Sequence, residues 1–253
     1  FGSAAKFIAT SVLETYLDSS VYINNGIFIL ETMGRDTGWL ASAAALAQLN
    51  GKQVADFIYL PETAFDIDKF LIDVKNKFEE QNQVYIVVSE GIRTAEGKFV
   101  AEAHAQAHDK FGHAQLGGVG NYLKNLIISS GITSRVKSLE LGVLQRCAMH
   151  CASNIDIEEA YEVGYEALRQ ASLGKCGYMI GIKRESNTPY KSSYFLIEAD
   201  KVANNVKYFP TEWINEEGNN LKAEVLEYLS PLVSSVPSVI SSLPMPVFKV
   251  FNK

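Results

Sequence analysis

The chain has 253 residues, 47% of them hydrophobic, and a formal net charge of −6. This length can bury one large core or two modest cores that share an interface. The acidic balance, with no Lys/Arg run longer than two, argues against a nucleic-acid-binding protein. No run approaches the ~18 apolar residues of a membrane span, and no signal-peptide pattern occurs. We therefore expect no membrane association and a cytoplasmic protein.

The chain opens with Phe1-Gly2-Ser3 and runs at once into an amphipathic helical pattern from Ile8 to Leu17. Such an opening is typical of the middle of a protein. We therefore expect a fragment or a processed chain whose upstream portion is missing.

Hydrophobic periodicity divides the rest of the chain into alternating strands and helices. Short apolar runs bounded by Gly, Pro or polar residues predict strands, and longer amphipathic or alanine-rich stretches predict helices. Strands are expected at 26–33, 57–60, 83–89, 136–141, 178–182 and 194–197, and helices at 39–50, 66–80, 122–130, 157–172 and 221–228. Residues 93–112 carry no clear pattern. This alternation predicts an α/β fold with a mostly parallel sheet and helices on both faces.

Polar residues follow the predicted strands at the points where the strands end. In an open parallel sheet, ligands bind beyond these carboxyl ends. The residues concerned are Met33-Gly34-Arg35, Pro61-Glu62, Ser89-Glu90-Gly91, and Gly142 with Gln145-Arg146. Two arginines and two glutamates are therefore expected to face one crevice. Guanidinium forks suit a phosphate and carboxylates suit sugar hydroxyls, which predicts a phosphorylated polyol as the ligand.

The same residues have a purely structural interpretation. Strand ends are often polar, and Arg35 would then pair with Glu31 or Asp36 while Glu90 caps a turn. The pattern alone leaves both interpretations open.

The three cysteines are assigned no site. Cys147, Cys151 and Cys176 are too few and odd in number for a disulfide framework and lack C-x-x-C spacing. A nucleophile at Cys147 or Cys151, near His150, would need an orienting partner and an exposed thiolate.

His104 and His108 have the i, i+4 spacing of a metal site, with Glu102 and Asp109 nearby. Alanine-rich exposed helices produce this spacing freely, so we do not predict a metal there. His113 is expected to order a loop rather than to act in acid–base chemistry.

Several blocks, in the right order, resemble the phosphofructokinase family. They are ETMGRDTGWLASAAALA, VVSEGI and LELGVLQRCAMHCASNIDIEEAYEVGYEALRQASLGKCG. FGHAQLGGVGNYL and EWINEEGN resemble the pyrophosphate-dependent branch found in bacteria. The resemblance covers nearly the whole chain and implies a two-lobe architecture, here incomplete. Residues 1–146 would form the fructose-6-phosphate-binding lobe. Residues 147–253 would form the remainder of the donor lobe and a carboxyl-terminal segment that returns to the sugar-binding lobe.

The resemblance assigns roles position by position. Met33, Gly34 and Arg35 match the family's Met-Gly-Arg, whose backbone and guanidinium hold fructose 6-phosphate and help neutralise the transferring phosphoryl group. Glu90 matches the glutamate that binds sugar hydroxyls. Arg146 matches the arginine that binds the 6-phosphate of the sugar.

Two positions depart from the family's pattern. Lys137 stands where relatives usually carry an arginine that reaches the 6-phosphate of a neighbouring subunit. Lysine keeps the charge but loses the bidentate fork. Val143 stands where relatives often have histidine or tyrosine, so we expect no direct sugar contact from it. A site shared across subunits implies a homodimer or homotetramer.

The family's donor side has no counterpart in these residues. Relatives carry upstream a glycine-rich donor-phosphate loop with an acidic metal-binding residue, and a Thr-Ile-Asp-Asn-Asp segment whose first aspartate is the general base. Phosphoryl transfer needs donor, metal, acceptor and base in line. We therefore expect this chain to supply the acceptor side only, to be inactive alone, and to depend on Mg²⁺ ligands in the upstream region.

Three functions remain as hypotheses. The first is a glycolytic phosphofructokinase that transfers a phosphoryl group from pyrophosphate, or from ATP, to O1 of fructose 6-phosphate. The second is a non-catalytic sugar-phosphate sensor or regulatory relative, for which Lys137 and Val143 would be early signs. The third is an unrelated α/β binding protein whose strand ends imitate the motif.

Overall fold

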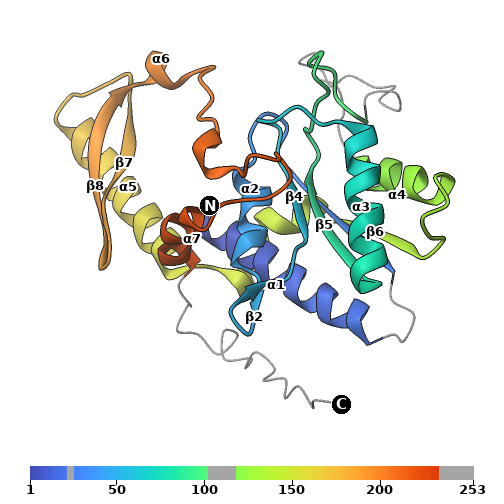
Figure 1. Cartoon of the computed structure of the whole chain (residues 1–253). Helices are drawn as coiled ribbons and strands as arrows, with labels where there is room; N and C mark the ends of the chain where they lie inside the picture. The colour runs from blue at the N-terminus through green and yellow to red at the C-terminus, as the bar shows by residue number, and fades with distance from the viewer. Residues whose placement is uncertain (22–25, 102–117, 234–253) are drawn as a thin grey trace.

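A four-stranded parallel sheet forms the centre of the computed structural model, which describes residues 1–21, 26–101 and 118–233 (Figure 1). The strand order is β4 (Phe57–Tyr59), β5 (Val84–Ser89), β1 (Ile27–Thr32) and β6 (Val136–Glu140). All three pairings are parallel. Every residue of β1, β4 and β5 is buried, as apolar strands covered on both faces require. The predicted α/β fold with a mostly parallel sheet is confirmed.

Helices cover both faces of this sheet (Figure 1). The first face is covered by α1 (Gly2–Ser20), and the second by α3 (Ile67–Gln81) and α4 (Val119–Ser129). Because successive strand residues point to opposite faces, β1, β4 and β5 each contribute to two separate cores. The first core includes Ile8, Val12, Leu30 and Val87, and the second includes Ile29, Val88, Phe70 and Leu123.

The helix predicted at 39–50 is wrong in its second half. The chain forms a short helix α2 (Trp39–Ser42), a 3-10 helix η1 (Ala43–Leu46), and a hairpin of β2 (Gln48–Leu49) and β3 (Lys52–Gln53). Asn50 and Gly51 make the hairpin turn with φ values of 53° and 75°. Asn-Gly is the favoured pair for a turn with two positive φ angles. This local signal outweighs the alanine-rich composition.

An arm made of residues 154–198 stands to one side of the sheet (Figure 1). It comprises the helix α5 (Asn154–Ser172) and an antiparallel hairpin of β7 (Tyr178–Asn187) and β8 (Tyr190–Glu198). Both strands extend beyond the predicted 178–182 and 194–197. No residue of α5 is buried, so the arm presents much of its surface to solvent.

The chain then returns from the arm to the α1 face of the sheet. The remaining elements are α6 (Ala199–Val202), η5 (Thr211–Trp213), α7 (Glu224–Leu229) and η6 (Ser230–Val233). Phe209, Ile214, Val225 and Leu229 join the first core. The lobe division at residue 146 stays a prediction. No helix in the described part of the chain is long and apolar enough to cross a membrane.

The arm and the sheet are joined by hydrogen bonds between helix ends. Asp156, in the first turn of α5, accepts from the backbone N–H groups of Gly2 and Ser3 at 3.0 and 2.6 Å. The Ser3 hydroxyl in turn accepts from the Ser153 N–H at 2.9 Å, and the buried Ser153 hydroxyl donates to the Leu232 carbonyl at 2.6 Å. The starts of α1 and α5 thus cap each other, and η6 closes the junction.

Candidate functional site

The candidate site begins where β1 ends, at a turn formed by Met33, Gly34 and Arg35, here named the β1 exit turn. Gly34 has φ of 144°, a conformation that strongly favours glycine. A Cβ at this position would lie 2.6 Å from both the Ser89 hydroxyl and the Thr37 carbonyl oxygen. The Ser89 hydroxyl donates to the Gly34 carbonyl at 2.6 Å. Both backbone conformation and crowding therefore require glycine in this turn.

Glu90 links the β1 exit turn to the end of β5. Its backbone N–H donates to the Thr32 carbonyl at 2.9 Å, and its Oε1 accepts from the Gly34 N–H at 3.1 Å. A Cβ on Gly91 would collide with the carbonyl oxygen of Arg35, so the two strand ends approach backbone to backbone. The structural interpretation in which Glu90 holds a turn is confirmed, and its Oε2 is not used in that bond.

The surroundings of Glu90 favour the protonated form of its carboxyl group more than bulk water would. Burial raises the pKa of its carboxyl group, while the bond from Gly34 and the charge of Arg35 lower it and Glu140 raises it. Burial has the largest effect, so the pKa lies above its ordinary value. A hydroxyl group that donated to the carboxylate would lower this pKa again.

Arg146 reaches the same region from the neighbouring strand. β6 ends at Glu140, and Gly142, with φ of 52°, begins the 3-10 helix η3 (Gly142–Arg146). Gln145 Oε1 accepts from the Met33 N–H at 3.2 Å, which ties η3 to the β1 exit turn. Arg146 itself is exposed.

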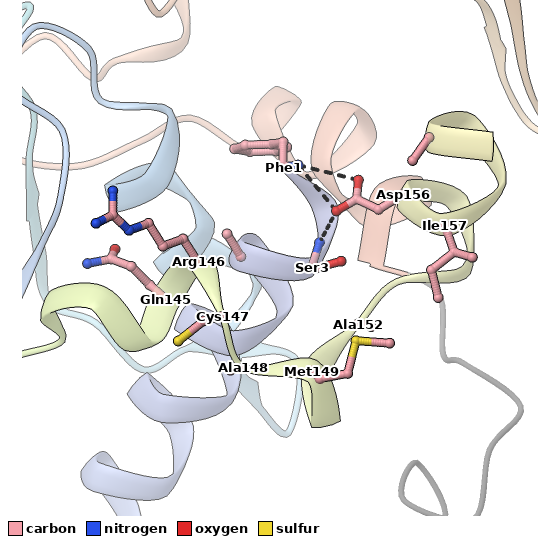
Figure 2. Close-up of a pocket in the computed structure, with 12 residues that line it drawn as sticks. Phe1, Ser3, Gln145, Arg146, Cys147, Ala148, Met149, Ala152, Asp156 and Ile157 are labelled. Atoms are coloured by element: carbon pink, nitrogen blue, oxygen red, sulfur yellow. Dashed lines mark hydrogen bonds and ion pairs between the residues drawn. The ribbon is translucent and has the colours of Figure 1, made fainter. Parts of the chain in front are cut away.

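A pocket of about 410 Å³ adjoins this link. Figure 2 shows Gln145 and Arg146 on one wall, with Asp156 and Ile157 on the other. The side chains of Gln145 and Arg146 point to the same side, away from Asp156. The pocket therefore opens between η3, the start of α1 and the start of α5, and its lining includes neither the β1 exit turn nor Glu90.

The structure thus joins Met33, Gly34, Glu90 and the turn that carries Arg146 through hydrogen bonds. Lys137 lies apart from them, as the second residue of β6, and its Nζ is 3.6 Å from Asp18 Oδ2. At about 3.3 Å per strand residue, it sits roughly 10 Å before the strand end. Its predicted contact with a neighbouring subunit stays a prediction.

Glu62 does not join the crevice that the strand ends predict. Its Oε1 accepts from the N–H groups of Gly38 and Phe209 at 2.9 and 2.8 Å. It thereby fastens the start of α2 to the returning segment. The direction of a side chain just after a strand depends on such tertiary partners, which the strand pattern does not reveal.

Glu31 is a buried acidic residue to which the sequence assigned no site role. It is 2% exposed within β1, and its carboxylate accepts from the N–H groups of Gly118 and Gly120 at 3.0 and 2.8 Å. Burial raises its pKa to about 7, although these two bonds lower it; Glu140 and Glu90 also raise it. In the sequence, a charged residue within an apolar strand is the signal for such a cap on a helix.

The other reactive residues form no second site among those described. Cys147 is exposed and its thiol donates to the Val143 carbonyl at 3.3 Å, while burial raises the pKa of the Cys151 thiol. His104, His108 and His113 lie outside the described residues. Within residues 1–21, 26–101 and 118–233, no group of three or more His, Cys, Asp or Glu side chains gathers as a metal site requires.

Comparison with known proteins finds the same family along most of the chain. A family model described as Phosphofructokinase matches residues 1–171. The pyrophosphate–fructose 6-phosphate 1-phosphotransferases of Methylococcus capsulatus and Xanthomonas campestris are each 39% identical over 235 residues, which is 92% of this chain and 55% and 56% of those proteins. The chain therefore spans little more than half the length of these relatives.

A solved structure extends the likeness to the fold. The crystal structure of the pyrophosphate-dependent phosphofructokinase from Marinobacter aquaeolei is 31% identical, with a TM-score of 0.77. The match covers 100% of this chain and 62% of that one. The match therefore includes the sheet, the helices on its faces and the arm.

Proposed function

Because this chain belongs to the phosphofructokinase family, we propose that it forms the sugar-phosphate side of a glycolytic phosphotransferase. The reaction moves a phosphoryl group from pyrophosphate to O1 of fructose 6-phosphate and gives fructose 1,6-bisphosphate. The names of the most similar relatives support pyrophosphate over ATP as the donor. The observation that carries the proposal is the pair of hydrogen bonds by which Glu90 and Gln145 hold the β1 exit turn.

We propose a role for each residue of the site, from the family's pattern and from the hydrogen bonds of the β1 exit turn. The N–H groups of Met33 and Gly34 are bonded to Gln145 and Glu90, so these two residues shape the turn from which Arg35 extends. The Arg35 guanidinium offsets negative charge on the phosphoryl group in transfer. Arg146 binds the 6-phosphate through a bidentate fork, and Glu90 Oε2 accepts from a sugar hydroxyl.

The remaining parts of the reaction come from outside these residues. The glycine-rich donor loop and the aspartate base of the family have no counterpart in the sequence. Magnesium use is general in the family, and we propose that its ligands lie outside these residues. We expect no turnover in a coupled assay with the 253 residues alone, and measurable turnover would refute this half-site assignment.

The proposal includes a subunit contact and a compartment. Lys137 is exposed on β6, and its Nζ, 3.6 Å from Asp18 Oδ2, would have to exchange partners to reach a neighbouring copy. A homodimer or homotetramer would let it reach that copy's 6-phosphate, as the family's pattern implies. We also propose that the reaction takes place in the cytoplasm.

Binding of the sugar phosphate tests the proposal directly. We expect isothermal titration calorimetry to detect fructose 6-phosphate binding to the chain. Arg146→Ala should weaken it about 10- to 100-fold, because a charge-assisted bond to a phosphate contributes about 1.5–3 kcal/mol. The affinity for fructose, which lacks the phosphate, should not change with the same substitution.

Arg169→Ala is the matched control, because Arg169 is an exposed arginine of α5 that pairs with Glu166. It should retain the wild-type affinity. An equal loss in both arginine variants, or no binding by the wild-type chain, would count against the site.

A non-catalytic sensor is the second candidate, supported by Lys137 and by Val143, which is 58% exposed beside Arg146. Recovery of the upstream coding sequence separates the two. An intact donor loop and aspartate base favour the enzyme, and their loss favours the sensor.

A further inference from the structure

Gln145 joins the two strand ends that carry the site arginines. Its Oε1 accepts from the Met33 N–H at 3.2 Å, and its Nε2 donates to the Gly142 carbonyl at 2.9 Å. The residue is 1% exposed. Because a side-chain amide has one accepting and one donating end, the N–H on one side and the carbonyl on the other fix its orientation. Both ends of the amide are therefore in use.

This bridge lies just beyond the point where the sheet ends. β1 and β6 run side by side with Glu31 opposite Glu140, and a bond of 3.1 Å from the Leu141 N–H to the Glu31 carbonyl extends the ladder by one step. Past that bond, the β1 exit turn and η3 diverge from sheet geometry. The Gln145 side chain takes over the connection between them.

Arg146 depends on the backbone that Gln145 anchors. It is the last residue of η3, directly follows Gln145, and has an exposed side chain. Immobilising a long, exposed side chain on a ligand costs conformational entropy. A fixed backbone beneath the guanidinium reduces that cost and sets the distance between Arg146 and the β1 exit turn.

We propose that Gln145 is a positioning residue that holds Arg146 in register with the β1 exit turn, so that Arg35 and Arg146 serve one sugar phosphate. The inference rests on the proposed function. It assigns a role in substrate affinity to Gln145, whose side-chain amide is uncharged and buried. The residue acts on the ligand through Arg146 rather than by touching the ligand.

A double-mutant cycle in fructose 6-phosphate affinity tests this coupling. Gln145→Met removes both hydrogen bonds and keeps the length of the side chain. Calorimetry should show affinity about 10-fold weaker than wild type, as the loss of two bonds and of their positioning effect implies. In the Arg146→Ala background the same substitution should change affinity less than about 2-fold, because coupled residues are non-additive.

Gln48→Met is the control, because Gln48 is an exposed glutamine of the β2–β3 hairpin, and it should bind as the wild type does. Thermal unfolding shows whether Gln145→Met stays folded. If it does not, Gln145→Glu gives a second test, since it keeps an acceptor for Met33 and replaces only the donor to Gly142. It should also weaken binding, and Arg146→Ala should again mask the effect.

Two results would overturn the inference. One is wild-type affinity in Gln145→Met, and the other is a loss of affinity that is undiminished in the Arg146→Ala background. In both cases the wild-type chain binds fructose 6-phosphate, so the proposed function survives. A wild-type chain that does not bind the sugar phosphate defeats the proposed function and, with it, this inference.

Discussion

At the scale of single residues, Glu31 links the strand that leads to the β1 exit turn with the start of α4. A carboxylate inside a buried strand is costly unless hydrogen bonds compensate. Glu31 obtains two, from Gly118 and Gly120 at the start of α4. It lies two residues before Met33, so the same strand anchors a helix and presents the β1 exit turn. The cap also fixes where the chain enters α4.

The raised pKa of Glu31 predicts a pH dependence of stability. Burial raises this pKa from 4.5 to about 7, so the folded state favours the protonated form. Its stabilising contribution is complete below the unfolded value and is lost as the pH rises through about 7. The shift corresponds to a loss of about 3 kcal/mol at most. Unfolding measured by circular dichroism should therefore show Tm falling from pH 5 to pH 8.

Glu31→Gln should flatten this dependence, because the amide does not titrate in that range. Glu79→Gln, at an exposed position of α3 with a side chain 65% accessible, should keep the wild-type slope. Identical slopes in Glu31→Gln and wild type would contradict the prediction.

At the scale of elements, the mutual capping of α1 and α5 holds the arm against the sheet. The first N–H groups of a helix have no partners within the helix. Asp156 supplies those partners for α1, and Ser3 supplies one for Ser153 at the start of α5. Ser3 and Asp156 of this junction also line the pocket beside Arg146.

Ser153→Ala tests the junction. The substitution leaves the buried Leu232 carbonyl without the donor it has at 2.6 Å, which costs about 1–3 kcal/mol. Thermal unfolding should therefore shift down by several degrees. Ser172→Ala removes an exposed hydroxyl at the other end of α5 and should change stability by less than about 0.5 kcal/mol. Equal effects of the two substitutions would show that the junction contributes nothing.

Elements were predictable where their signals are local. The run from Ile27 to Leu30 is apolar and follows Gly26, and Asp66 caps α3 by accepting from the Lys69 N–H at 3.0 Å. The Asn50-Gly51 pair was also a local signal, for a hairpin turn, but the alanine content of the preceding residues favoured a helix prediction. Strand and helix positions therefore follow largely from periodicity, apart from this segment and the lengths of β7 and β8.

The site was only partly predictable. The strand ends predicted Met33, Gly34, Glu90 and Arg146, and the structure joins the first three and the turn that carries Arg146 by hydrogen bonds. They also suggested Glu62, whose carboxylate turns to Gly38 and Phe209 instead. The roles of Gln145 and Glu31 depend on partners that are distant in sequence. No pattern in the sequence supplies those partners.

At the scale of the whole molecule, the arm leaves apolar side chains on its surface. Ile157, Tyr161, Tyr165 and Leu168 are 44%, 71%, 58% and 73% exposed. Their spacing of four, four and three residues places them on one face of α5. A two-stranded hairpin and one helix have little core of their own, so this apolar face of α5 stays exposed to solvent.

Hydrophobic-dye fluorescence tests the exposure of this face. Leu168→Glu combined with Tyr161→Glu should lower the fluorescence of bound anilinonaphthalenesulfonate, because it breaks the apolar face with charge. Fructose 6-phosphate affinity should stay unchanged, since the site lies at the strand ends. Ile72→Glu, at a residue of α3 that is 59% exposed, should lower the signal less. Undiminished fluorescence in the double variant would contradict the prediction.

The bond between Met33 and Gln145 joins residues 112 positions apart, and the bond between Gly34 and Glu90 joins residues 56 apart. Contacts of such long range form slowly, because the entropy of closing large loops is lost before the contacts stabilise the chain. We therefore expect the capacity to bind a sugar phosphate to appear late in folding, after β6 has docked beside β1. A nascent chain that ends before β6 would have the β1 exit turn in its sequence but no site.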